Sequence, residues 1–80
     1  MTKRERNKLI EKARQLVFEA LSFMEEARDE EIESLEQWPE SLQETDRYYD
    51  ASNRADAIEN AHSDLEAVYD AMTDILEGNI

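Results

Sequence analysis

The sequence contains no cysteine and only one glycine, one proline and one histidine. The absence of cysteine excludes a disulfide framework and any thiolate metal site. A single glycine excludes the glycine-rich loops that cradle nucleotide phosphates, and no Ser-His-Asp set or zinc-ligand spacing is present. We therefore expect a protein that is not an enzyme and that holds no cofactor.

Long apolar runs are also missing. No apolar segment approaches the ~20 residues that cross a bilayer, and the charged start MTKRERNKLIEK lacks the apolar stretch of a signal peptide. We expect a soluble, cytoplasmic protein that does not bind membranes. Folding of a chain of 80 residues buries only ~60% of the surface that the unfolded chain exposes. A core this thin favours self-association, so a homo-oligomer is expected.

Basic residues are scarce, since 9 Lys and Arg stand against 21 Asp and Glu, a net charge of -12. Residues 1–14 hold six of the bases and two acids (net +4), so the rest of the chain, with three bases and 19 acids, holds -16. Such a body repels nucleic acid and attracts basic partners, with an association rate that falls as salt rises. We expect a basic partner protein and no direct contact with nucleic acid.

Two helices of similar length are predicted. From Lys3 to Gln37 there is no glycine or proline, and apolar residues recur at helical spacing, which predicts a helix over 3–37. The residue before a proline is pushed out of the α region, so Trp38-Pro39 begins a turn over 38–45. An unbroken 3-4-3-4 spacing of Tyr48 to Leu76 then predicts a second helix over 46–77.

These elements predict an all-α fold, an antiparallel two-helix hairpin that forms one domain over 1–80. Thr45 or Asp46 is expected to cap the second helix at its start, and Gly78 is expected to cap its end. Trp38 and Tyr48 are expected to form an aromatic plug beside the turn. Their position makes them structural residues.

The apolar arc of the first helix is too wide for one partner helix to cover. Ala13, Ala20 and Ala27 are predicted to allow a close approach to the second helix. The rest of the arc is then left for a second hairpin, giving a homodimeric four-helix bundle or a higher oligomer. The residues assigned to this oligomer interface are Ile10, Val17, Leu21 and Met24. Phe18 points away from the arc, as an ordinary exposed side chain or as a contact in an assembly.

The uneven charge distribution favours an antiparallel arrangement of the two helices. It places the basic residues near the start beside acids near the end of the chain, although each exposed pair contributes only ~0.2 to 1 kcal/mol. The predicted pairing sets Lys8, Lys12 and Arg14 beside Asp70, Asp74 and Glu77.

Acidic residues recur along the outer faces of both helices and define a candidate partner-binding surface. One reading is a solvated helix face that keeps a small protein soluble. The alternative is imitation of a nucleic-acid backbone, in which rigid carboxylates occupy a groove meant for phosphates, although duplex DNA is denser at ~1.7 Å per charge. The candidate residues are Glu25, Glu26, Asp29, Glu30, Glu33, Asp56, Glu59, Glu66, Asp70 and Asp74.

A metal site is a further alternative. Glu59 and His62 match the Glu-x-x-His spacing with which ferritin-like helices bind iron, and Glu31 is the acid within the apolar arc of the first helix. Two-helix encapsulated ferritins build such a site across a dimer interface. In the hairpin, however, Glu31 is expected far from His62, and a lone histidine at a seam position is also typical of a core residue or a device that fixes register.

The run from Glu30 to Met72 resembles a family of small, acidic helical proteins of bacteriophages and prophages. In that family an acidic helix ends in a Pro-Glu-x-x-Gln turn, which here corresponds to Pro39, Glu40, Leu42 and Gln43, followed by a polar stretch with an arginine, Arg47 or Arg54. Trp38 and the Tyr48-Tyr49 pair depart from the pattern. The resemblance implies a phage origin and brings no established activity.

Taken together, these features predict a non-enzymatic interaction protein that binds a basic, nucleic-acid-handling host protein, in the manner of anti-restriction or anti-CRISPR inhibitors. A self-assembling phage component and a ferritin-like di-iron protein remain as alternatives.

Overall fold

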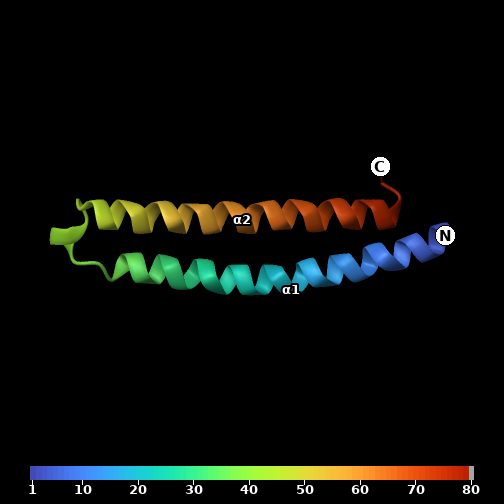
Figure 1. Cartoon of the computed structure of the whole chain (residues 1–80), viewed down its shortest axis with the longest axis horizontal. Helices are drawn as coiled ribbons and strands as arrows, with labels where there is room; N and C mark the ends of the chain where they lie inside the picture. Colours follow the sequence, from blue (N-terminus) through green and yellow to red (C-terminus); the bar gives the residue numbers. More distant parts are fainter. Residues whose placement is uncertain (80) are drawn as a thin grey trace.

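The computed structural model describes residues 1–79 and consists of two long helices joined by a short turn. α1 spans Lys3–Glu36, α2 spans Asp46–Glu77, and a short 3₁₀ helix, η1 (Glu40–Leu42), lies between them. The helices run antiparallel and side by side, so both termini are at one end of a rod of 61 × 19 × 17 Å and the turn is at the other (Figure 1). The all-α helical hairpin expected from the sequence is confirmed.

Threonine hydroxyls fix the start of each helix. The Thr2 hydroxyl accepts a hydrogen bond from the Glu5 backbone N–H at 3.1 Å, and the Thr45 hydroxyl accepts one from the Tyr48 N–H at 3.3 Å. Each bond satisfies a backbone donor that has no partner within its own helix. Thr45, and not Asp46, is therefore the cap of α2.

Proline and glycine mark where the helices end. α1 ends at Glu36, close before Trp38-Pro39, as the restriction on the residue before proline requires. Gly78 adopts φ 73°, in the left-handed region that favours glycine, and its N–H donates to the Ile75 carbonyl at 3.2 Å.

The seam between the helices follows one stripe on each. On α2 it is the stripe expected from the 3-4-3-4 spacing, and it includes the two buried residues, Ala55 and His62. On α1 the less exposed positions also recur at alternating intervals of three and four. They are Asn7, Ile10, Arg14, Val17, Leu21, Met24, Arg28, Glu31, Leu35 and Trp38.

This seam corrects the predicted use of the two apolar stripes of α1. Ile10, Val17, Leu21 and Met24, assigned above to an oligomer interface, lie half-buried in the seam against α2. Of the alanines assigned to the close helix approach, Ala27 is exposed, and Ala13 and Ala20 are half-buried at the edge of the seam. The physical reason is the length of the two stripes. The seam stripe continues through Leu35 and Trp38 to the turn, whereas the stripe that contains Ala27 reaches Glu30 one turn later. Only the seam stripe can therefore line the whole of α2.

The register also differs from the predicted charge pairing. Arg14 donates to the Thr73 hydroxyl at 3.2 Å and lies over the Tyr69 ring, 5.8 Å from its centroid, instead of meeting an acid of α2. Lys8 and Lys12 lie off the seam and are exposed. Within residues 1–79 the ion pairs that join the helices are Arg28–Glu59 and Arg54–Glu31.

Candidate protein-binding surface

Arg28 is the centre of an acidic cluster on one side of the seam. Its guanidinium lies 3.2 Å from Asp29, 4.0 Å from Glu25 and 4.0 Å from Glu59 of α2, and its side chain is 22% exposed. The three carboxylates are more than half exposed, so most of their surface remains in solvent. One arginine therefore lies among three carboxylates from two helices, and the cluster keeps a net negative charge.

His62 and Glu66 continue this cluster along α2. The His62 Nδ1 lies 3.0 Å from a Glu66 carboxylate oxygen, and the imidazole is packed into the seam with 10% of its side chain exposed. A shallow hollow of about 260 Å³ opens here between Phe18, Leu21, Ser22, Glu25, His62 and Glu66. Glu25 of α1 and Glu66 of α2 thus face one hollow from its two walls.

Two more acids extend the cluster by helical spacing. Asp56 precedes Glu59 by three residues and Asp70 follows Glu66 by four, so each lies on the same side of α2 as its neighbour. We call this surface the acidic side. It consists of Glu25, Asp29, Asp56, Glu59, Glu66 and Asp70, all of them exposed.

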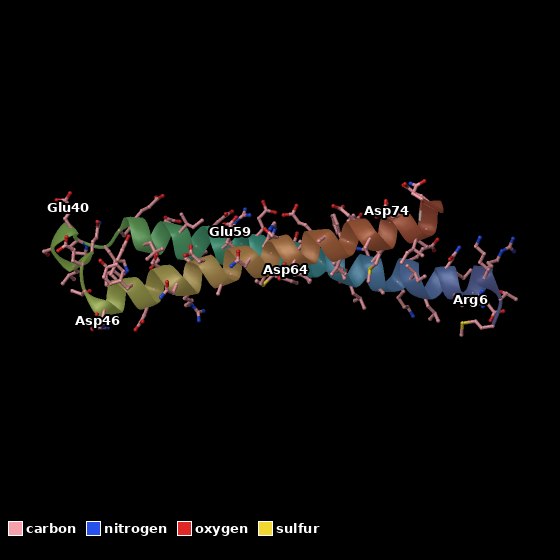
Figure 2. All side chains as sticks on the ribbon, turned by 90° about the horizontal axis from the view of Figure 1, so that it is seen from above. Arg6, Glu40, Asp46, Glu59, Asp64 and Asp74 are labelled. Atoms are coloured by element: carbon pink, nitrogen blue, oxygen red, sulfur yellow. The ribbon has the colours of Figure 1, made fainter. Side chains whose placement is uncertain are left out.

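The other acids of the predicted surface lie elsewhere. Glu26, Glu33 and Asp74 project from the outer backs of their helices, away from the seam, and Glu30 lies on the opposite side, in line with Ala27. Figure 2 shows acidic side chains around the rod, with Glu59 and Asp74 along its length and Glu40 and Asp46 at the turn. The predicted surface is therefore not one face, but six of its ten residues share one side.

The opposite side of the seam carries one ion pair and an exposed apolar stripe. Arg54 Nε donates to Glu31 at 2.8 Å, and this hydrogen bond, together with the charge of Glu31, raises the pKa of Arg54. Leu9, Leu16 and Phe23 are exposed on this side. The sequence predicts that the alanines of this stripe, Ala13, Ala20 and Ala27, contact α2, whereas its large side chains are exposed.

The residues proposed as iron ligands do not meet within the hairpin. Glu31 is bonded to Arg54, Glu59 lies nearest Arg28, and His62 pairs with Glu66. No group of three or more His, Cys, Asp and Glu side chains that could hold a metal is found in residues 1–79. The Glu-x-x-His spacing thus corresponds in this structure to a seam histidine beside an acid one turn later.

At the turn, Trp38 and Tyr48 form the predicted aromatic contact. Their ring centroids are 5.6 Å apart in an edge-to-face arrangement, and both side chains are half-buried. Tyr49 meets Tyr48 in a second edge-to-face contact, with 6.2 Å between ring centroids, and is 53% exposed. A hollow of about 380 Å³ lies beside Trp38, and it is lined by Ser34, Gln37, Pro39, Leu42, Thr45 and Arg47.

Comparison with known proteins gives no relative from which a role could be transferred, since no family model, no curated protein and no solved structure matches the chain. Across residues 1–79, no helix combines the length and the apolar character needed to cross a membrane.

Proposed function

We propose that this protein is a non-enzymatic interaction protein whose acidic side binds a basic, nucleic-acid-handling protein. The observation that supports this most is the clustering of six exposed carboxylates from both helices on one side of a rigid rod. Asp56 and Asp70 are 14 residues apart, about 21 Å along α2, so the acids cover a length typical of a protein contact. A solvated face that served only solubility would need no such clustering.

The charge density bears on whether this surface imitates DNA. A duplex of 61 Å carries roughly 36 phosphate charges at ~1.7 Å per charge, whereas the whole chain has 21 acids. The partner's basic site would therefore meet fewer charges than it meets on DNA. We propose competition at part of a DNA-binding groove, with binding that weakens as salt is raised.

The biological setting follows from the resemblance around Pro39, Glu40, Leu42 and Gln43. We propose a phage-encoded protein that acts in the host cytoplasm on a restriction or CRISPR nuclease, as an inhibitor of its access to DNA. Basic nucleases of this kind present clefts lined by Lys and Arg, which attract a body with net charge -12.

The experiment is a competition assay. A labelled DNA duplex is bound to each of a panel of restriction endonucleases and CRISPR effector nucleases, and the protein is titrated in at 50 and 200 mM salt while fluorescence anisotropy reports DNA release. We expect displacement of DNA from at least one nuclease. The midpoint should rise several-fold at the higher salt, because surface charges are screened.

Matched variants separate the acidic side from net charge alone. Glu25→Gln, Glu59→Gln and Glu66→Gln together remove three charges from the acidic side, and Glu33→Gln, Glu40→Gln and Glu44→Gln remove three from outside it. The first variant should lose at least tenfold in affinity and the second about twofold or less. Equal losses, or DNA binding that stays unaltered across the panel, would contradict the proposal.

A self-assembling accessory component of a phage is a second candidate, and the exposed Leu9, Leu16 and Phe23 favour it. That function requires large oligomers that persist at high salt, whereas the inhibitor requires salt-sensitive binding to a basic protein. Light scattering across a salt series distinguishes the two.

A further inference from the structure

α1 carries a second apolar stripe that α2 covers only in part, since Ala13 and Ala20 are half-buried and the other members are exposed. It runs through Leu9, Ala13, Leu16, Ala20, Phe23 and Ala27, again with alternating intervals of three and four. Its large members are 55% (Leu9), 61% (Leu16) and 72% (Phe23) exposed. An exposed apolar row of this length is typical of a surface that another helix covers.

α2 continues this surface on the same side of the seam. The Arg54–Glu31 hydrogen bond shows which side of each helix this is. On α1, Ala27 lies one turn before Glu31. On α2, Ala61 and Val68 follow Arg54 at intervals of seven residues and therefore lie on the same side as Arg54. The apolar residues of α2 in this row are Ala57, Ala61, Val68, Ala71 and Ile75, of which Val68 is 44% and Ile75 41% exposed. The two rows together form what we call the apolar face.

We propose that the apolar face binds a second copy of this chain in an antiparallel, two-fold symmetric four-helix bundle. The α1 row is suited to this because it pairs with itself when reversed. Leu9 then faces Ala27 of the second copy, Ala13 faces Phe23, and Leu16 faces Ala20. Each large side chain meets a small one in every pair, and two-fold symmetry makes each pair twice.

Charge at the ends of the row selects the same arrangement. The next positions outward are Arg6 and Glu30, both exposed, and the reversed pairing sets Arg6 of one copy beside Glu30 of the other. A two-fold axis along the rod would instead set α1 of each copy against α2 of the other, so the α1 row would no longer pair with itself. The self-pairing of the α1 row and the Arg6–Glu30 pairs at its ends therefore favour the antiparallel arrangement.

α2 is compatible with the same two-fold axis. In antiparallel pairing the midpoint of the α2 row is residue 66, so Ala57 pairs with Ile75 and Ala61 with Ala71 of the second copy. The midpoint of the α1 row is residue 18. Phe18 packs against Tyr69 with ring centroids 6.1 Å apart, so the two midpoints lie within about one turn of each other along the rod. The same reversal sets Asp64, the charged residue of the row between Ala57 and Ile75, beside Val68 of the second copy (Figure 2).

The area supports a second copy as the occupant. The five large side chains expose of the order of 500 Å² of apolar surface per copy, so a symmetric pair buries about 1,000 Å², the lower bound for a specific interface. The alanines and the Arg6–Glu30 pairs add to this. A single hairpin in which Ala55 is the buried apolar residue also has the most to gain from a shared core.

The dimer has a consequence for binding that rests on the proposed function. The acidic side and the apolar face lie on opposite sides of the seam, so two hairpins joined through their apolar faces turn both acidic sides outward. The assembly would present two equivalent acidic surfaces and engage two basic sites at once.

The test is sedimentation equilibrium between 1 and 100 μM at 0.15 and 0.5 M salt. The expected mass is twice the 9.4 kDa of one chain at both salt concentrations, because the interface is apolar. Leu16→Glu and Phe23→Glu should each weaken dimerisation at least 100-fold. Phe18→Glu, which makes the same chemical change at a side chain 53% exposed but on the acidic side, should weaken it about threefold or less, and circular dichroism checks that all variants stay helical.

A charge exchange tests the antiparallel pairing itself. Arg6→Glu and Glu30→Arg alone should each weaken the dimer about three- to tenfold, and the double variant should recover wild-type affinity. A monomer at 100 μM, equal effects of Phe18→Glu and Phe23→Glu, or no recovery in the double variant would each overturn the proposal. The nuclease competition assay on the Phe23→Glu variant reports separately on the acidic side, so the two proposals can fail independently.

Discussion

Replacing Trp38 by alanine should destabilise the hairpin by about 2–3 kcal/mol. Removal of a fully buried Trp or Phe side chain costs roughly 3–5 kcal/mol, and Trp38 is half-buried, so half of the lower value, about 1.5 kcal/mol, applies. Loss of the edge-to-face contact with Tyr48, at 5.6 Å between centroids, adds roughly 0.5–1.5 kcal/mol. The whole domain is expected to have roughly 4–12 kcal/mol of stability, so the change is large.

The measurement is urea and thermal unfolding followed by far-ultraviolet circular dichroism at one fixed protein concentration, since dimerisation makes the midpoint depend on concentration. A loss of 2–3 kcal/mol lowers Tm by roughly 10–20 °C in a domain of this size. Tyr49→Ala is the matched control, because Tyr49 also lies at the turn but is 53% exposed, and it should cost less than about 1 kcal/mol. If Trp38→Ala left Tm unchanged and abolished partner binding, the turn would be a recognition surface and the structural reading of Trp38 would be wrong.

Two further changes probe the cap and the acidic cluster. Thr45→Ala removes the hydroxyl that accepts from the Tyr48 N–H and should lower the free energy of unfolding in urea by about 1 kcal/mol. Thr45→Ser keeps a hydroxyl and should retain most of that stability. Equal losses in both variants would show that the cap bond contributes little. Arg28→Gln leaves three carboxylates without their shared cation and should cost about 1 kcal/mol at low salt and clearly less in 0.5 M salt, while Arg28→Lys should retain most of the stability. A loss for Arg28→Gln that did not change with salt would mean that Arg28 acts through packing of its alkyl chain.

The bounds of the two helices and the seam stripe of α2 were predictable from local chemistry. The effect of Pro39 on the preceding residue, the left-handed preference of Gly78 and the unbroken spacing of α2 act within a few residues, so they can be read from the chain directly. The choice between two stripes on α1 could not be made this way. Both stripes have the same spacing, and the choice depends on which of them still has apolar residues, Leu35 and Trp38, beside the turn.

The candidate surface was also only partly predictable from the sequence. The acids of residues 25–36 and of α2 were evident from composition, but their grouping required the register of the two helices. The role of Arg28 does not follow from the sequence, because a base within an apolar spacing has no evident partner until the register places Glu59 of α2 beside it. Glu25 and Asp29 are neighbours of Arg28 on α1, but its contact with Glu59 of α2 is a tertiary property.

The hairpin shape has a kinetic consequence. The contact between Trp38 and Tyr48 closes a loop of about ten residues, which forms in roughly 10–100 ns, whereas the contact between Arg14 and Thr73 spans most of the chain. Folding should therefore proceed as a zipper from the turn toward the termini, and opening should begin at the terminal end. Three residues of the apolar stripe of α1, Leu9, Ala13 and Leu16, lie in that terminal half. A second copy bound there would stabilise the part of the hairpin that opens first. Amide exchange in residues 5–20 should therefore slow as protein concentration rises.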